Sequence, residues 1–184
     1  MRTHSDRTER DLAMGPEMSQ QAGTKTPRTT TFNILFVCTG NTCRSPLAEG
    51  IARQELDRRG WQHVQVASAG IAAHPGDGAS EFAVSVAARH GVPLDAHRSQ
   101  PLTPELVAWA DLVLAMGSSH VDSVRRLGGD DKVRTLGDFA SGEDRGYSVR
   151  DPFGGPEEVY EGTYKELWSL IADALDRLEP ILHP

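Results

Sequence analysis

The sequence predicts an α/β fold with a parallel sheet, and two hydrophobic patterns lead to that prediction. Short apolar or alternating runs, typical of strands, take turns along the chain with segments whose apolar residues recur at helical spacing. Such alternation gives a parallel sheet with right-handed crossovers. The run 112–116, Leu-Val-Leu-Ala-Met, contains no polar residue, as expected of a strand covered on both faces. We therefore expect three layers, with helices on both faces of the sheet.

Four segments are predicted to form the strands. Residues 32–37 read Phe-Asn-Ile-Leu-Phe-Val and lead directly into a polar loop, so they form the first strand. Residues 64–66 alternate as Val-Gln-Val, which is the period of a strand. The remaining two predicted strands are residues 112–116 and 132–136.

The predicted helices show either an apolar stripe at helical spacing or a recognisable start signal. They comprise residues 46–59, residues 81–90, a helix opened by Thr103 as N-cap with Pro104 after it, residues 119–126 and residues 157–178. The last of these is the longest, and Gly162 weakens it near its start.

Composition limits the class of protein. A chain of 184 residues is long enough for one domain, and its net charge of −7 argues against nucleic-acid binding. No apolar run approaches the roughly 18 residues of a membrane span, and the N-terminus lacks the apolar core of a secretory signal. Its two cysteines do not suggest a disulfide scaffold and fit a reducing compartment. We expect a cytoplasmic protein.

Residues 1–30 differ in composition from the rest of the chain. They are rich in charged residues, Gln, Ser and Thr, with almost no bulky apolar side chain. Such a segment buries too little surface to offset the entropy of ordering, so we expect a disordered tail. The domain is then expected to comprise residues 31–184.

The loop after the first predicted strand carries the chemistry. It reads Cys38-Thr-Gly-Asn-Thr-Cys-Arg44-Ser-Pro and leads into a helix. A helix N-terminus binds oxyanions and favours thiolate over thiol. Arg44 offers a planar fork for two phosphate oxygens, Gly40 lets the backbone turn inward, and Ser45 is expected to cap the helix with Pro46 at its first position. A thiolate in a phosphate cradle predicts phosphoryl transfer through a cysteinyl phosphate.

A general acid is also needed, because the leaving group of a phosphate ester or phosphoramidate departs poorly without a proton. The segment Asp151-Pro-Phe-Gly-Gly lies late in the chain, and its proline and glycines predict a turn. Asp151 is therefore the candidate acid for the first step and the candidate base for the second. Plain turn chemistry is the alternative explanation of this Asp-Pro pair.

These motifs resemble the low-molecular-weight protein tyrosine phosphatases, over roughly residues 32–180. The resemblance rests on the Val-Cys-x-Gly-Asn-x-Cys-Arg-Ser-Pro loop and on Asp-Pro-Phe near the end. It implies a sheet in the order 2-1-3-4, phosphorylated proteins as substrates, phosphate as product, and no metal or cofactor. We expect a monomer, although the sequence leaves the oligomeric state open.

The resemblance also assigns roles to individual residues. Cys38 would be the nucleophile, Arg44 the phosphate clamp and Asp151 the acid. Ser68 and His97 would support the loop together with two of its own residues, Asn41 and Ser45. The other members of the phosphate-binding loop would be Thr39, Gly40, Thr42 and Cys43.

Within the family, the chain looks closest to the bacterial protein-arginine phosphatases. Thr42 carries this reading, because tyrosine-directed members usually have a bulky aliphatic residue there. Phe153 is compatible with it, since a single aromatic residue follows Asp151-Pro where tyrosine-directed relatives often have one or two tyrosines. Both would then contribute to substrate specificity. The alternative is an ordinary tyrosine phosphatase, in which Thr42 merely caps a loop amide.

The cysteine count bears on further alternatives. Arsenate reductases of related fold use cysteines outside the phosphate loop, and this chain has only Cys38 and Cys43. Their spacing does not fit a zinc site. Under peroxide, a sulfenic acid on Cys38 could be trapped as a disulfide by Cys43, or Cys43 could be a small packing residue. A phosphate-binding or redox-sensing module without turnover is the remaining class, and the intact Asp151 argues against it.

Overall fold

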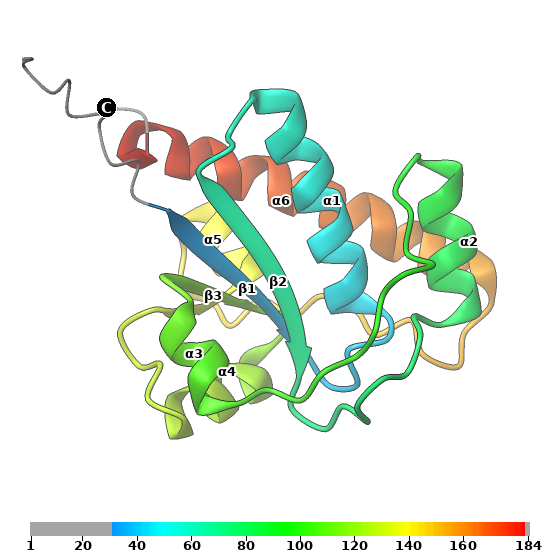
Figure 1. Ribbon diagram of the computed structural model, residues 1–184, viewed down its shortest axis with the longest axis horizontal. Helices are drawn as coiled ribbons and strands as arrows, with labels where there is room; N and C mark the ends of the chain where they lie inside the picture. Colours follow the sequence, from blue (N-terminus) through cyan, green and yellow to red (C-terminus); the bar gives the residue numbers. More distant parts are fainter. Residues whose placement is uncertain (1–30, 183–184) are drawn as a thin grey trace, which may run out of the picture.

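The computed structural model describes residues 31–182, with a sheet of four parallel strands at its centre (Figure 1). The strands lie in the order β2-β1-β3-β4, and each neighbouring pair is parallel. They comprise β1 Phe32–Cys38, β2 Val64–Gly70, β3 Leu112–Ala115 and β4 Val133–Thr135. The predicted α/β class and the order 2-1-3-4 are therefore confirmed.

Helices cover both faces of this sheet and complete the three predicted layers. α1, α2, α5 and α6 contribute to the core on one face, and α3 and α4 to the core on the other (Figure 1). They comprise α1 Arg44–Arg59, α2 Glu81–Arg89, α3 Pro104–Trp109, α4 Ser118–Arg126, α5 Leu136–Ser141 and α6 Glu157–Leu182.

β1 lies inside the sheet, and its side chains alternate between the two cores. Ile34 and Phe36 pack in the core beside α1 and α6, while Leu35 and Val37 pack in the core beside α3 and α4. This two-sided burial explains why the strand is apolar at successive positions. It also fixes the carboxyl end of β1, where Cys38 lies.

The structure differs from the predictions around the fourth strand. β4 ends at Thr135, and Leu136 begins α5, a helix that the sequence did not predict. The Thr135 hydroxyl accepts a hydrogen bond from the backbone N–H of Asp138 at 3.2 Å, so this threonine is the N-cap of the short helix. Leu136 is apolar and directly follows the strand residues, so the sequence places the end of the fourth strand one residue too late.

Three helices are longer than predicted, and one of them, α4, begins one residue early at Ser118. α1 begins at Arg44, so Pro46 is its third residue rather than its first. α6 continues beyond residue 178 to Leu182, with Pro180 in its last turn. No helix within residues 31–182 is long and apolar enough to cross a bilayer. The tail predicted for residues 1–30 lies outside the described residues.

Candidate active site

The loop 39–43 joins β1 to α1 at the carboxyl ends of the strands, where open α/β sheets bind their ligands. Asn41, at φ 54°, is the only non-glycine residue with positive φ in the described part of the chain. The sequence assigned the turn to Gly40, but the left-handed residue is its neighbour. Asparagine tolerates this conformation because its short polar side chain forms hydrogen bonds nearby.

Hydrogen bonds hold Asn41 in this conformation from several sides. Its side-chain amide donates to Ser45 Oγ at 2.8 Å and to Ser68 Oγ at 2.9 Å. Its Oδ1 accepts from the backbone N–H of Gln100 at 2.9 Å, and its carbonyl oxygen lies 2.8 Å from His97 Nε2. Asn41 is fully buried, and its two bonds to the serine hydroxyls are buried with it. The four residues named from the resemblance as loop supports thus lie together.

Two further residues belong to this network and were missed in the sequence. Glu49 accepts a hydrogen bond from Ser68 Oγ at 2.6 Å, and Gln100 Nε2 donates to the carbonyl oxygen of Ser68 at 3.0 Å. Glu49 lies one helical turn after Ser45, so its position on the same face of α1 was an available signal. Gln100 lies in an irregular segment, and no periodic pattern indicates it.

Cys38 faces the start of α1. Its Sγ accepts from the backbone N–H of Asn41 at 3.3 Å and lies 3.0 Å from Ser45 Oγ. Only 2% of the residue is exposed. Ser45 does not cap the helix as expected, because Cys43 occupies the N-cap position without a side-chain hydrogen bond. The serine hydroxyl instead contacts the sulfur, which faces the partial positive charge of the helix start.

Arg44 and Asp151 meet at the same place from opposite ends of the sequence. Arg44 Nη2 donates to Asp151 Oδ2 at 2.6 Å, and Nη1 donates to the carbonyl oxygen of Val149 at 3.3 Å. The Arg44 Nε is buried and has no acceptor among the described residues. The Asp151 side chain is 48% exposed and also accepts from the backbone N–H of Phe153. The arginine thus retains an unused donor for an incoming oxyanion.

These groups line one cavity of about 210 Å³. The loop, the arginine and the late Asp-Pro-Phe segment all contribute to its walls: Cys38, Thr39, Gly40, Thr42, Cys43, Arg44, Asp151 and Phe153. Phe153 is 78% exposed and forms part of the rim. A thiol, a guanidinium, backbone N–H groups and a carboxyl group in one pocket can bind a phosphoryl group and transfer it to sulfur.

The sequence model of the low molecular weight phosphotyrosine protein phosphatase family matches residues 33–180. The chain belongs to this family. The match includes both the loop after β1 and the segment with Asp151, so the resemblance seen in the sequence is confirmed. The protein is therefore a phosphatase.

Relatives of this phosphatase have two named specificities. A protein-arginine-phosphatase of Geobacillus stearothermophilus is 43% identical over 150 residues, covering 80% of this chain and 97% of that protein. The low molecular weight protein-tyrosine-phosphatase PtpB of Staphylococcus aureus is 39% identical over 148 residues, covering 79% and 98%. One solved structure is a cysteine-to-serine variant of the YwlE arginine phosphatase with a phosphorylated active-site serine. It matches with a TM-score of 0.75 at 40% identity, covering 80% of this chain and 96% of that one.

Cys43 lies in the wall of the phosphatase pocket and has polar neighbours. Its Sγ lies 3.4 Å from Ser80 Oγ, 3.4 Å from the Tyr160 hydroxyl and 3.7 Å from Thr42 Oγ1. Burial and the contact with Cys43 raise the pKa of Tyr160, so this hydroxyl stays protonated. Both cysteines are free thiols. Two hydroxyl-bearing side chains from distant segments, Ser80 and Tyr160, therefore approach the Cys43 sulfur.

His120 is a site residue that the sequence did not indicate. Its Nε2 lies 2.9 Å from Thr39 Oγ1. Its place soon after the end of β3 was the available signal, because the carboxyl ends of parallel strands meet at one edge. Among the described residues, no group of three or more His, Cys, Asp or Glu is arranged to hold a metal.

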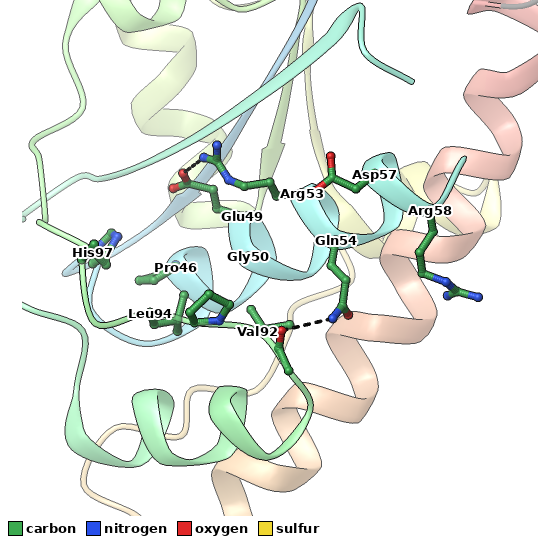
Figure 2. Close-up of a pocket in the computed structure, with 13 residues that line it drawn as sticks. Pro46, Glu49, Gly50, Arg53, Gln54, Asp57, Arg58, Val92, Leu94 and His97 are labelled. Atoms are coloured by element: carbon green, nitrogen blue, oxygen red, sulfur yellow. Dashed lines mark hydrogen bonds and ion pairs between the residues drawn. The ribbon is translucent and has the colours of Figure 1, made fainter. Parts of the chain in front are cut away.

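Figure 2 shows a larger cavity of about 680 Å³ between α1 and the segment 91–97. His97 lies at one end and Arg58 at the other, while Arg53 pairs with Glu49 across its wall. None of the catalytic candidates lines it, so its size does not make it the active site. Through His97, however, its wall is connected to the phosphate loop.

Proposed function

We propose that this phosphatase hydrolyses phosphoarginine in proteins through a phosphocysteine intermediate on Cys38. The observation that carries the proposal is a threonine, Thr42, in the wall of a pocket that belongs to a chain similar to named protein-arginine phosphatases. Its short side chain leaves room beside the phosphoryl group, and its hydroxyl offers the guanidino nitrogens a hydrogen-bonding partner that an aliphatic residue lacks.

In the first step, Cys38 Sγ attacks phosphorus as the bond from phosphorus to the guanidino nitrogen breaks. Arg44 and the backbone N–H groups of the loop stabilise the charge on the phosphoryl oxygens. The phosphoryl group competes with Asp151 for the Arg44 guanidinium. The carboxylate released from this ion pair takes up a proton from solvent and donates it to the departing nitrogen. The half-exposed position of Asp151 at the pocket rim supports this role.

In the second step, water attacks the phosphorus of the intermediate. Asp151 now accepts a proton from the water, the S–P bond breaks, and Cys38 leaves as a thiolate with inorganic phosphate as product. The Ser45 hydroxyl, 3.0 Å from the sulfur, stabilises that thiolate. The phosphorylated serine of the YwlE variant supports Cys38 as the phosphoryl acceptor here.

Phosphotyrosine is the second candidate substrate. The exposed ring of Phe153 at the rim favours it, because an aromatic side chain there can pack against a tyrosyl ring. The similarity to PtpB supports the same reading. The two candidates share the mechanism and differ only in how the pocket wall selects the leaving group.

The deciding measurement is kcat/KM on peptides of matched sequence that carry phosphoarginine or phosphotyrosine, under reducing conditions. We expect a clear preference for phosphoarginine, and we expect Thr42→Ile to shift the preference toward phosphotyrosine. Thr42→Ser, which keeps the hydroxyl, serves as the matched control. A wild-type preference for phosphotyrosine would overturn the proposal, and unchanged selectivity in Thr42→Ile would remove its main support.

We also propose that Cys43 protects the nucleophile against oxidation. Peroxide oxidises the Cys38 thiolate to a sulfenic acid, and the Cys43 thiol then displaces water to form a disulfide. Thiol treatment should restore the activity of the peroxide-treated wild type but not of Cys43→Ser. Equal recovery in both would contradict the protective role. We further propose that the enzyme is cytoplasmic and acts on phosphorylated proteins as a monomer; the two free thiols fit a reducing compartment.

A further inference from the structure

Thr39 and His120 form a contact at the phosphate loop that the proposed mechanism does not use. Thr39 directly follows Cys38, lines the catalytic pocket and is exposed to it. His120 lies on α4, beyond the carboxyl end of β3, and only 3% of it is exposed. Its Nε2 lies 2.9 Å from Thr39 Oγ1. The contact therefore joins a pocket-lining hydroxyl to a rigid, buried ring.

The ring of His120 is neutral at physiological pH. Burial and the nearby Arg44 guanidinium lower its pKa from 6.5 to about 4, although Asp151 opposes this shift. A neutral imidazole has one N–H donor and one bare nitrogen acceptor. The role of His120 therefore depends on which of its two ring nitrogens carries the proton.

The contacts of the two ring nitrogens indicate which of them carries the proton. His120 Nδ1 is buried without a hydrogen-bond partner among the described residues. A proton on Nδ1 would be a buried donor with no acceptor, which is rarer in proteins than an unsatisfied acceptor. A proton on Nε2, in contrast, lies on the line to Thr39 Oγ1. The favoured arrangement has Nε2–H donating to the threonine oxygen.

This arrangement also sets the direction of the threonine hydroxyl. Because the oxygen accepts a bond from the ring, its own proton must turn toward another acceptor. Thr39 lines the pocket, so the phosphoryl oxygens of a bound substrate are the acceptors on that side. A fixed hydroxyl stabilises such oxygens at a lower cost in reorganisation than a freely rotating one.

We propose that His120 is a positioning residue for phosphoryl transfer, whose Nε2–H holds the Thr39 hydroxyl so that its proton points at a phosphoryl oxygen. His97 contacts the carbonyl oxygen of Asn41, while His120 contacts the side chain of Thr39, so two histidines support different points of the loop. The inference rests on the proposed phosphoryl transfer to Cys38, but it does not depend on the choice between phosphoarginine and phosphotyrosine.

The first test reads the protonation of the ring without any turnover. Nitrogen-15 NMR of the wild type at neutral pH is expected to show a neutral His120 with its proton on Nε2. The resonances are assigned by their loss in His120→Gln. A neutral ring protonated on Nδ1, or a doubly protonated ring, would overturn the proposal.

The second test is a double-mutant cycle with His120→Leu and Thr39→Val. Each single change is expected to lower kcat/KM about 10-fold and to weaken competitive inhibition by inorganic phosphate by a similar factor, as for loss of one hydrogen bond. The double variant should be no worse than the worse single variant, because both remove the same interaction. Fully multiplicative effects, or wild-type inhibition by phosphate in His120→Leu, would overturn the proposal.

Two control variants separate positioning from folding. His120→Gln keeps an N–H donor at similar reach and should remain within about threefold of the wild type. Val121→Ala loosens α4 beside His120 without touching Thr39, so it should lower the melting temperature but not kcat/KM. A loss of activity in Val121→Ala as large as in His120→Leu would assign the effect to helix packing.

The substrate for these assays is whichever phosphopeptide the wild type cleaves faster. If it cleaves neither, the proposed function fails, while the NMR test still decides the state of His120.

Discussion

At the scale of single residues, the site depends on pairs that come together from distant segments. Arg44 is nearly buried, and its contact with Asp151 at 2.6 Å joins the start of α1 to the loop before α6. A charge-assisted bond of this kind orients the arginine. Asp151 is thus placed beside the phosphate-binding groups, where a general acid is needed.

Replacing Asp151 tests that role directly. Asp151→Asn removes the transferable proton, so we expect kcat on the preferred phosphopeptide to fall by ~10²–10⁴-fold. The comparison variant is Asp95→Asn, an exposed carboxylate outside the pocket, which should retain wild-type turnover. A loss below about tenfold in Asp151→Asn would point to a different acid.

At the scale of elements, the packing between α1 and the segment 91–97 controls the loop support. Gly50 lies in α1, and a Cβ built on it would come within 2.5 Å of Val92 Cγ1 and 3.1 Å of Leu94 Cδ2. The same segment carries His97, which contacts the phosphate loop. The close approach of helix and segment therefore sets the position of His97.

A pair of glycine substitutions tests this packing. Gly50→Ala should destabilise the protein by about 1–3 kcal/mol through overpacking, and it should lower kcat/KM by displacing His97. Gly162→Ala in α6 is the matched control, because its new methyl group meets no atom within 4 Å. That change should stabilise the protein by about 0.5–1 kcal/mol and leave kcat/KM unchanged. Urea unfolding and steady-state kinetics measure both effects, and a Gly50→Ala enzyme with wild-type kcat/KM would contradict the link to the loop.

At the scale of the whole molecule, a buried carboxylate in α5, that of Asp138, binds the backbone of residues 145–147. This segment precedes the loop that carries Asp151. Asp138 accepts hydrogen bonds from the backbone N–H groups of Arg145 and Tyr147 at 3.1 Å and of Gly146 at 2.9 Å. Burial alone would raise the pKa of Asp138, but these donors together with the Thr135 side chain outweigh it and hold the pKa below the ordinary value of 3.8.

The sign of this shift predicts how stability depends on pH. Because the folded pKa is depressed, the carboxylate stabilises the protein above its unfolded pKa, and this contribution is lost as the pH falls through the folded pKa. Asp138→Asn should therefore unfold at lower urea than the wild type at pH 7, and the gap should narrow below about pH 4. The exposed Asp144→Asn should show little change at either pH. A gap that stays constant down to pH 2 would refute the assignment.

The local chemistry of the site followed from the sequence because its residues lie close together in the chain. Cys38 and Arg44 flank one short loop between an apolar strand and a helix, and this placement together with their spacing predicted a phosphate cradle. The alternation of strands and helices likewise predicted the parallel sheet, and the resemblance supplied its strand order. These features depend on short-range periodicity, which a sequence displays directly.

Only the tertiary structure decided which distant side chains support the residues of the pocket. Gln100 and Tyr160 come from separate segments and stand in no pattern that differs from an ordinary loop or helix residue, while only the position of His120 after β3 indicates it. α5 was not predicted because Leu136, its first residue, directly follows β4 and was taken as part of the strand. Sequence spacing constrains neighbours within a few turns of helix, whereas contacts between segments depend on how the layers pack, and the packing places His120 beside the hydroxyl of Thr39.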